Sequence, residues 1–275
     1  MSASPFTDPR DGRRALLSLI DDGEHLIELR YRDGRGKWAK RWALTPASAD
    51  AIAASLTPRG LDVYVGLAPR LGSKDEAQRQ YGPVRVLWAD CDTARSVAKL
   101  REFDREPTLV VASGGVDEGV DKEHAYWLLD DALDPEAARG PLRRLAAALD
   151  ADPAAAEPAR VLRLPGSRNH KTGRTAVAVR WTAEVHQIDA LVAELPEVQP
   201  AASQHGAAVA AVKVPDGKRH AAVVSLLGLM RSWGACVEVL DAAAIAFVEH
   251  QCVPDPTPAD IEHARATARD IARRY

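Results

Sequence analysis

The fold is decided by the stretch Val84-Arg85-Val86-Leu87-Trp88-Ala89-Asp90-Cys91-Asp92-Thr93. Its apolar and β-branched residues predict a buried strand that ends in two carboxylates. Successive side chains of a strand point to opposite faces, so Asp90 and Asp92 share one face and Cys91 turns toward the core. Two converging carboxylates repel each other unless a cation or an acid–base role offsets the repulsion. The pair therefore predicts a Mg²⁺ or Mn²⁺ site, and the simpler alternative is a strand followed by an Asp before a helix.

The composition is that of an ordinary globular chain of 275 residues, long enough for one large domain or two smaller ones. The formal net charge is −3, so a nucleic-acid-binding surface must be local if there is one. The cysteines Cys91, Cys236 and Cys252 have no paired spacing, which argues against structural zinc and disulfides and predicts a reducing cytoplasm. No apolar run approaches the ~20 residues of a membrane span, and we expect neither a membrane partner nor a signal peptide.

Strand and helix patterns are mixed over residues 1–195, and they predict an α+β core. Residues 25–44 predict a β-hairpin around the turn Asp33-Gly34, with Trp38 and Trp42 on one face of its second strand. Such hairpins argue against a purely parallel sheet. The Ala/Pro-rich residues 196–215 predict a linker. After the linker, helical patterns predict a small all-α domain made of residues 217–232, 236–249 and 258–274.

A second candidate for function is His124, which begins an expected strand after the turn Ser113-Gly114-Gly115. If the segments before and after this turn form a hairpin, His124 lies near Ser113 across the ladder. The glycines allow an anionic ligand to approach the backbone closely. The structural alternative is a solvated or core histidine, which is the commoner role of a lone His.

A third candidate is the basic run from Arg160 to Arg180, which contains no acidic residue. Guanidinium and ammonium groups in such a run suit a triphosphate or a nucleic-acid backbone, and the alternative is a solvated basic hairpin. Arg70 follows an earlier strand and could reach the same face as Asp90, although isolated basic residues are more often surface residues. Three acids before the run could each supply a third carboxylate: Asp150, Asp152 and Glu157.

Together these segments resemble the archaeo-eukaryotic primase superfamily, and especially the primase-polymerases of phages, plasmids and other mobile elements. The first family motif, an apolar strand ending in Asp-x-Asp, is matched by residues 87–92. The second, a Ser/Gly turn with a histidine, is matched by residues 113–115 and His124. The third, a carboxylate before an Arg-rich strand and a Pro-Gly-Thr-x-Asn-x-Lys run, is matched by Glu157 and residues 160–171.

The sequence departs from the family pattern at two points. Residues 116–123 lengthen the spacing between the turn and the histidine, and we expect them to form an acidic flap. Glu157 stands where Asp is usual, with Asp152 as the alternative third carboxylate. The helical tail, residues 216–275, is similar to the small primase C-terminal domain, so the resemblance covers nearly the whole chain.

The resemblance implies a catalytic core over residues 1–195 that synthesises or extends primers by two-metal-ion catalysis. In this hypothesis Asp90, Asp92 and Glu157 hold two Mg²⁺ or Mn²⁺ ions, and His124 is a further catalytic residue. The nucleoside triphosphate, with ribose or deoxyribose, is bound by six residues: Arg70, Ser113, Arg160, Arg163, Asn169 and Lys171. The implied partners are a single-stranded DNA template and its primer, with a replicative helicase as a further candidate.

Two other functions use the same features. A non-catalytic replication initiator would bind DNA with the same fold and incorporate no nucleotides. A metal-dependent phosphoesterase would use the same carboxylates without a triphosphate. The dense basic run favours the nucleotidyltransferase among the three.

Overall fold

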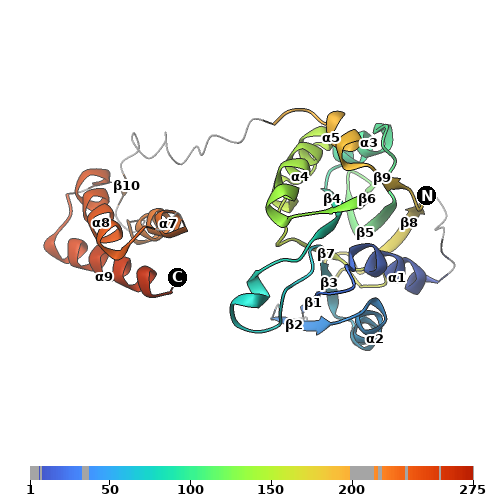
Figure 1. Cartoon of the computed structure of the whole chain (residues 1–275), viewed down its shortest axis with the longest axis horizontal. Helices are drawn as coiled ribbons and strands as arrows, with labels where there is room; N and C mark the ends of the chain where they lie inside the picture. Colours follow the sequence, from blue (N-terminus) through green and yellow to red (C-terminus); the bar gives the residue numbers. More distant parts are fainter. Residues whose placement is uncertain are drawn as a thin grey trace. The chain divides into compact units, whose positions relative to one another are not determined.

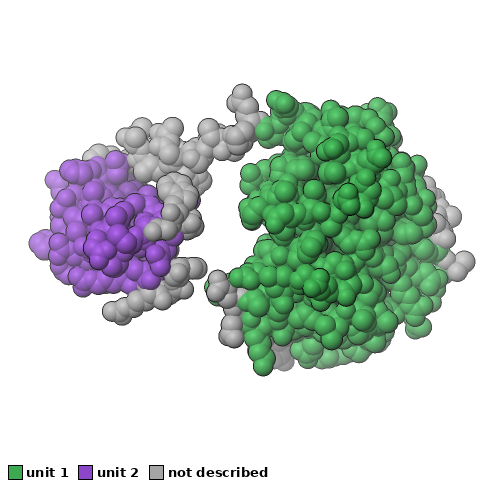
Figure 2. All heavy atoms as spheres, in the orientation of Figure 1, with its two compact units in different colours: residues 1–198 green, residues 199–275 purple. Residues whose placement is uncertain are grey.

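The computed structural model describes residue 6 and residues 8–32, 37–198, 214–215, 219–232, 235–253 and 255–274. The chain divides into two compact units, residues 1–198 and residues 199–275, which Figure 2 distinguishes by colour. The expected hairpin turn Asp33-Gly34 and most of the expected linker over 196–215 lie outside the described residues.

The first sheet of unit 1 has the strand order β2-β1-β3-β7, and all neighbours are antiparallel. β1 (Ile27–Arg32) and β2 (Trp38–Ala43) pair as predicted, and β3 (Asp62–Gly66) and β7 (Val161–Arg163) extend the sheet. The helix α2 (Pro46–Leu56) contacts β1 and β2, and α1 (Pro9–Ile20) packs on α2 (Figure 1). The Thr45 side chain caps α2 and Pro46 occupies its first turn, which sets where this helix begins. A 3-10 helix, Thr57–Arg59, connects α2 to β3.

The second sheet has the order β4-β6-β5-β8 and is also antiparallel. Its strands are β4 (Val84–Cys91), β5 (Leu109–Asp117), β6 (Val120–Leu133) and β8 (Val177–Trp181), and the short β9 (Val185–His186) pairs parallel to β6. The helices α3 (Ala94–Glu102) and α4 (Pro135–Leu149) pack on β4, and α5 (Ile188–Ala193) contacts β6. Two further 3-10 helices span Asp75–Arg79 and Pro153–Ala155. The predicted α+β core is confirmed, with both sheets mainly antiparallel.

The deciding strand β4 is buried as predicted. Trp88 and its cross-strand partner Tyr126 are almost completely buried, and Cys91 is inaccessible to solvent. Burial raises the pKa of the Cys91 thiol to about 12, and the neighbouring carboxylates add to that rise. The Thr93 side chain caps α3 in a capping box with Ser96, so the chain turns into a helix directly after Asp92.

Residues 116–123 form no separate flap, so that expectation was wrong. β5 continues to Asp117 and β6 begins at Val120, which makes one long hairpin. Its two-residue turn consists of Glu118 and Gly119, whose φ angles of 47° and 81° are left-handed, as tight hairpin turns require. Asp117, Asp121 and Glu123 are therefore part of the ladder, with Asp117 opposite Val120, and Glu118 is in the turn.

Unit 2 is helical, as predicted, with α7 (Arg219–Ser232), α8 (Val237–Gln251) and α9 (Pro258–Arg274). Two short segments, β10 (Val214–Pro215) and β11 (Cys252–Val253), pair in parallel. The unit has its own core, in which Leu227, Leu240 and Ala268 are inaccessible to solvent. Across the parts of the chain that the structure describes, no helix combines the length and the hydropathy needed to cross a membrane.

Candidate active site

A cleft of about 460 Å³ lies between the ends of strands from both sheets of unit 1. Strands β3 and β7 of the first sheet and β4, β5 and β6 of the second supply its walls. The cleft brings together eight of the residues predicted from the sequence: Asp90, Asp92, Ser113, His124, Arg160, Arg163, Asn169 and Lys171.

The two carboxylates at the end of β4 both face this cleft but differ in exposure. Asp90 is buried, and its Oδ2 accepts a hydrogen bond of 2.6 Å from Arg160 Nη2. The Asp92 side chain is half-exposed, and its Oδ1 lies 3.5 Å from Lys122 Nζ. Each acid therefore has a positively charged side chain beside it, Arg160 for Asp90 and Lys122 for Asp92. These charges offset the repulsion expected between the two carboxylates.

The third carboxylate beside this pair is Asp152, the alternative in the sequence analysis. Arg160 Nη2 donates to Asp152 Oδ2 at 3.0 Å, so one guanidinium bridges Asp152 and Asp90. Glu157 does not line the cleft: its carboxylate pairs instead with Arg139 and Arg143 on α4. Neither acid is among the cleft-lining residues, but the shared guanidinium joins Asp152 and not Glu157 to Asp90, so the geometry favours Asp152.

His124 lies directly opposite Asp90 in the β4–β6 ladder, with its Nε2 3.5 Å from Asp90 Oδ1. Burial lowers the pKa of His124, and the attraction of Asp90 only partly opposes that effect. The imidazole is therefore neutral near pH 7, and its buried Nδ1 has no hydrogen-bond partner among the described residues. A neutral histidine with an unpaired ring nitrogen can still exchange a hydrogen bond with a ligand in the cleft.

The turn Ser113-Gly114-Gly115 is a β-bulge rather than the end of β5. The β5–β6 register shifts between Ala112 and Val116, and Ser113 and Gly115 line the cleft. Bulges of this kind redirect side chains next to active sites. Gly114 has a φ of +79°, and a Cβ there would lie 3.1 Å from the carbonyl oxygen of Arg174. Glycine is therefore required at this point of the bulge.

Arg163 is held rigidly by three partners. Its Nη1 donates to Asp62 Oδ1 at 2.6 Å and to the carbonyl of Arg168 at 2.8 Å, and its Nη2 donates to the Tyr64 hydroxyl at 2.9 Å. Burial would raise the pKa of Asp62, but hydrogen bonds from His170, Arg163 and Arg32 outweigh it and lower that pKa to about 2. The cleft therefore presents a guanidinium whose position is fixed before any ligand binds.

The loop after β7 is folded around Asn169. Its carbonyl accepts the N–H groups of Thr172 and Gly173, and its Oδ1 accepts the N–H of Lys171 at 3.1 Å. Thr172 Oγ1 then donates to the Gly114 carbonyl at 2.6 Å, which fastens this loop to the bulge. Asn169 thus shapes the loop, while the exposed Lys171 has no ion pair with any residue in the described ranges.

Arg70 does not reach the cleft, which corrects the prediction made for it. Its side chain is only 2% exposed, and its Nη2 lies 2.6 Å from Glu28 Oε2. Its Cζ lies 4.1 Å from the centroid of the Tyr81 ring, on which the guanidinium stacks. The strand that precedes it, β3, belongs to the first sheet rather than to the sheet of Asp90. Arg70 is therefore a buried structural residue.

Three cleft residues were missed by the sequence analysis: Arg32, Tyr64 and Lys122. Asp62, also missed, does not line the cleft but accepts a hydrogen bond from Arg163 and so fixes the position of that cleft residue. A signal for two of them is visible in Leu61-Asp62-Val63-Tyr64-Val65, because the alternation places Asp62 and Tyr64 on the face opposite the buried valines. Lys122 carries no such signal, since its place depends on the hairpin turn at residues 118–119.

The carboxylates fit a hard divalent cation that is completed by ligand oxygens. Within the described part of the chain, no three His, Cys, Asp or Glu side chains converge into a site by themselves. Magnesium commonly binds one or two carboxylates and takes its other ligands from water and substrate phosphates. Asp90 and Asp92, together at the cleft and flanked by cations that a metal could replace, meet that description.

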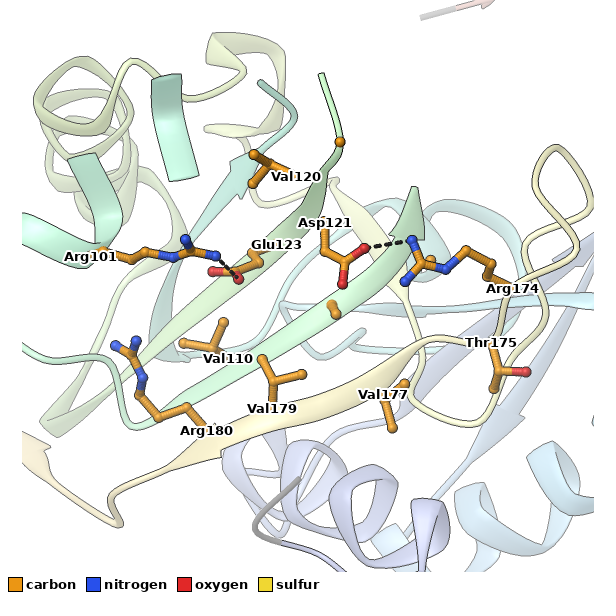
Figure 3. A pocket seen from close by; sticks show the side chains of 13 residues that line it. Arg101, Val110, Val120, Asp121, Glu123, Arg174, Thr175, Val177, Val179 and Arg180 are labelled. Atoms are coloured by element: carbon orange, nitrogen blue, oxygen red, sulfur yellow. Dashed lines mark hydrogen bonds and ion pairs between the residues drawn. The ribbon is translucent and has the colours of Figure 1, made fainter. Parts of the chain in front are cut away.

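A second hollow, of about 780 Å³, lies on the opposite face of the second sheet (Figure 3). Because side chains alternate along β6, Glu123 points away from the His124 side of the sheet and into this hollow. There Glu123 Oε1 lies 3.3 Å from Arg101 Nη2. Asp121 is likewise paired with Arg174. Its two acids, Asp121 and Glu123, are thus each paired with an arginine above an apolar floor of Val110, Val177 and Val179.

Comparisons with known proteins find likeness in structure alone. No family model matches the sequence, and no curated protein matches it. The AEP domain of the cyanophage S-2L primase-polymerase superposes with a TM-score of 0.55 at 21% identity, over 68% of this chain and 98% of that domain. The catalytic domain of primase RepB′, solved with initiator DNA, gives 0.51 at 22% identity over 74% of this chain and 98% of its own.

The longer structure of primase RepB′ covers 97% of this chain and 98% of its own, with a TM-score of 0.51 at 17% identity. That likeness extends beyond unit 1 into the helical unit. The fold of this chain is thus shared with solved primases at 17–22% sequence identity. The chain has the fold of the archaeo-eukaryotic primase-polymerases.

Proposed function

We propose that this chain is a DNA-dependent nucleotidyltransferase that makes or extends primers on a single-stranded template. One observation carries the proposal: two carboxylates and three basic side chains line one cleft. Asp90 and Asp92 supply the acids, and Arg160, Arg163 and Lys171 supply the cations. The likeness to a primase-polymerase domain and to a primase solved with DNA supports it.

The reaction joins a 3′-hydroxyl to the α-phosphate of a nucleoside triphosphate and releases pyrophosphate. Arg163 binds the triphosphate without first losing side-chain freedom, because Asp62 and Tyr64 already hold it. Lys171 reaches the same cleft from the loop built around Asn169. Ser113 and the neutral His124 can add hydrogen bonds to phosphate oxygens from the opposite wall.

The carboxylates have a different part in the reaction. Divalent metal ions, when bound, offset the negative charge that develops on the reacting oxygens. Asp90 and Asp92 would hold them, with Asp152, which shares Arg160 with Asp90, as the candidate third carboxylate. Arg160, which bridges Asp90 and Asp152, must then exchange at least one of these carboxylates for a phosphate of the substrate. The Arg160 guanidinium would thus be paired with a negatively charged oxygen both before and after the substrate binds.

The test is an incorporation assay with the full-length chain. The protein is incubated with single-stranded DNA and labelled ribo- or deoxyribonucleotides, with and without a primer, in Mg²⁺ or Mn²⁺. We expect metal-dependent products from the wild type and none from the folded variants Asp90→Asn and Asp92→Asn. Asp131→Asn, an exposed acid at the far end of β6, is the matched control and should remain active.

Two results would replace the proposal by its alternatives. Tight template binding without incorporation of any nucleotide would indicate a non-catalytic replication initiator. Release of phosphate or cleavage of DNA in the absence of a triphosphate would indicate a phosphoesterase.

A further inference from the structure

One face of the first sheet has residues that the nucleotide cleft does not account for. Strand alternation divides the sheet: Leu29, Val63 and Val65 are inaccessible to solvent on one face. The other face, here called the aromatic face, combines three aromatic and three basic side chains from β1, β2 and β3. These are Arg30, Arg32, Trp38, Lys40, Trp42 and Tyr64.

The aromatic face is ordered by register. Trp38 lies opposite Arg32, and Lys40 lies opposite Arg30, which in turn lies opposite Tyr64. Aromatic and cationic side chains therefore alternate along β2 and are neighbours across the strands. This arrangement places π-faces beside charges that can bind phosphates.

Ring contacts fix the aromatic side chains. The Trp38 and Tyr64 ring centroids are 5.2 Å apart at an interplanar angle of 50°, and Arg32 Cζ lies 5.5 Å from the Trp38 ring centroid. Lys40 Nζ lies 5.8 Å from the Trp42 ring. Trp38 nevertheless remains 50% exposed, which is high for so large an apolar side chain. A ring that is both fixed and exposed is available to stack with a ligand.

The charge that this face shows to solvent is positive. Its two acids, Glu28 and Asp62, are buried, with side chains 0% and 2% exposed. Glu28 pairs with Arg30, and Asp62 pairs with Arg32. The basic side chains stay accessible, because Arg30 and Arg32 are 28% and 29% exposed and Lys40 is 41% exposed. The surface is thus basic although the whole chain carries a net charge of −3.

The aromatic face is continuous with the cleft. Arg32 and Tyr64 belong to both, since they line the cleft that contains Asp90 and Arg163. Tyr64 also supports Arg163, which lies 4.7 Å from its ring centroid. A ligand that leaves the cleft along Tyr64 therefore meets Trp38 next.

We propose that the aromatic face is a stacking platform for single-stranded nucleic acid, the template strand beside the cleft. Bases would stack on Trp38 and Trp42, and phosphates would pair with Lys40 and the arginines. The occupant follows from the chemistry of the face: stacking rings select bases, and the interleaved cations select a polyanion. This assignment rests on the proposed function, which supplies a reason for a template at this cleft.

The experiment measures binding of a labelled single strand of about 12 nucleotides, the scale of such sites, to the full-length chain without metal or nucleotide. An abasic strand of equal length has the phosphates but no bases. We expect the wild type to bind the intact strand about 10-fold more tightly than the abasic one. Trp38→Ala should lose most of this difference, and Trp38→Phe should retain it. Trp42→Ala should also weaken binding of the intact strand.

Matched controls separate stacking from other effects. Val185→Ala truncates another half-exposed apolar residue, on β9 of the other sheet, and should bind like the wild type. Lys40→Ala should lower the slope of log affinity against log salt concentration by about one, which corresponds to one lost phosphate contact. Arg41→Ala, on the opposite face of β2, should leave this slope unchanged.

Two outcomes would overturn the platform: equal affinity of the wild type for intact and abasic strands, or wild-type binding by folded Trp38→Ala. The result is separable from the proposed function. A wild type that incorporates no nucleotide but shows Trp38-dependent binding refutes the nucleotidyltransferase and supports the platform. A wild type that extends primers but binds intact and abasic strands with equal affinity refutes the platform and leaves the nucleotidyltransferase proposal standing.

Discussion

The backbone N–H of Asp152 donates a hydrogen bond of 3.0 Å to the carbonyl oxygen of Asp90. This bond fastens the loop after α4 to the end of β4, and Arg160 then joins the two carboxylates from the side. Glu157, only five residues later, has turned away to Arg139 and Arg143 on α4. Two acids five residues apart thus have quite different surroundings, and only Asp152 is joined to Asp90.

The first prediction compares these two acids. Asp152→Asn should lower nucleotide incorporation by roughly 100-fold, because it removes a carboxylate beside the metal-binding pair. Glu157→Gln should change incorporation less than about threefold and act on stability, since exposed ion pairs contribute up to about 1 kcal/mol. Steady-state incorporation and thermal unfolding of both variants check this. The opposite ranking would return Glu157 to the site.

The second prediction concerns Asp62 and acid. Its pKa of about 2 lies below the ordinary value of 3.8, so its ion pairs stabilise the fold above pH 4 and are lost as the pH falls toward 2. Asp62→Asn should therefore cost about 2 kcal/mol of unfolding free energy near pH 7 and almost nothing near pH 2. Denaturant unfolding across this range measures it. A penalty that is independent of pH would show that the loss is one of packing.

A third prediction separates stability from binding at Arg70. Arg70→Met leaves the buried Glu28 without its closest partner, which should cost about 3 kcal/mol of unfolding free energy. The KM for the nucleoside triphosphate should not change, because Arg70 lies outside the cleft. The double variant with Glu28→Gln should regain part of the stability. A several-fold higher KM at unchanged stability would contradict the structural role.

The fourth prediction uses a matched pair of glycines. Gly114→Ala and Gly119→Ala both place a side chain at positive φ, which should cost each about 1 kcal/mol. Only Gly114 has close neighbours, with Arg174 O 3.1 Å and Asn169 Cβ 3.3 Å from an added Cβ. Gly114→Ala should therefore also raise the KM for the triphosphate, by displacing the loop around Asn169. Equal kinetics in the two variants would show that the bulge does not set the shape of the cleft.

The sequence predicted the elements whose signals are local. Asp90 and Asp92 meet at one cleft with Cys91 buried behind them, as expected, and local capping by Thr45 and Thr93 begins α2 and α3. These features depend on neighbours within a few residues, where strand alternation and capping rules apply.

Features that depend on which sheet a strand joins were not predicted. Arg70 follows a strand, as Asp90 ends one, but the two strands lie in different sheets, so the inference that they share a face failed. The turn at Glu118-Gly119 was hidden within an acidic segment that suggested an insertion, although Gly119 is well suited to its left-handed φ. In both cases the deciding information is long-range pairing, which no local pattern contains.

The cleft takes its walls from both sheets of unit 1, and this has a consequence for folding. Arg163 and Tyr64 belong to one sheet, whereas Asp90 and His124 belong to the other. A nucleotide that contacts both walls adds its binding free energy to any opening that separates the sheets. Slowed hydrogen exchange should then appear together in β3 and β6 on addition of substrate, as one cooperative unit. The substrate would act as the last structural element of the domain, tying the two sheets together for as long as it stays bound.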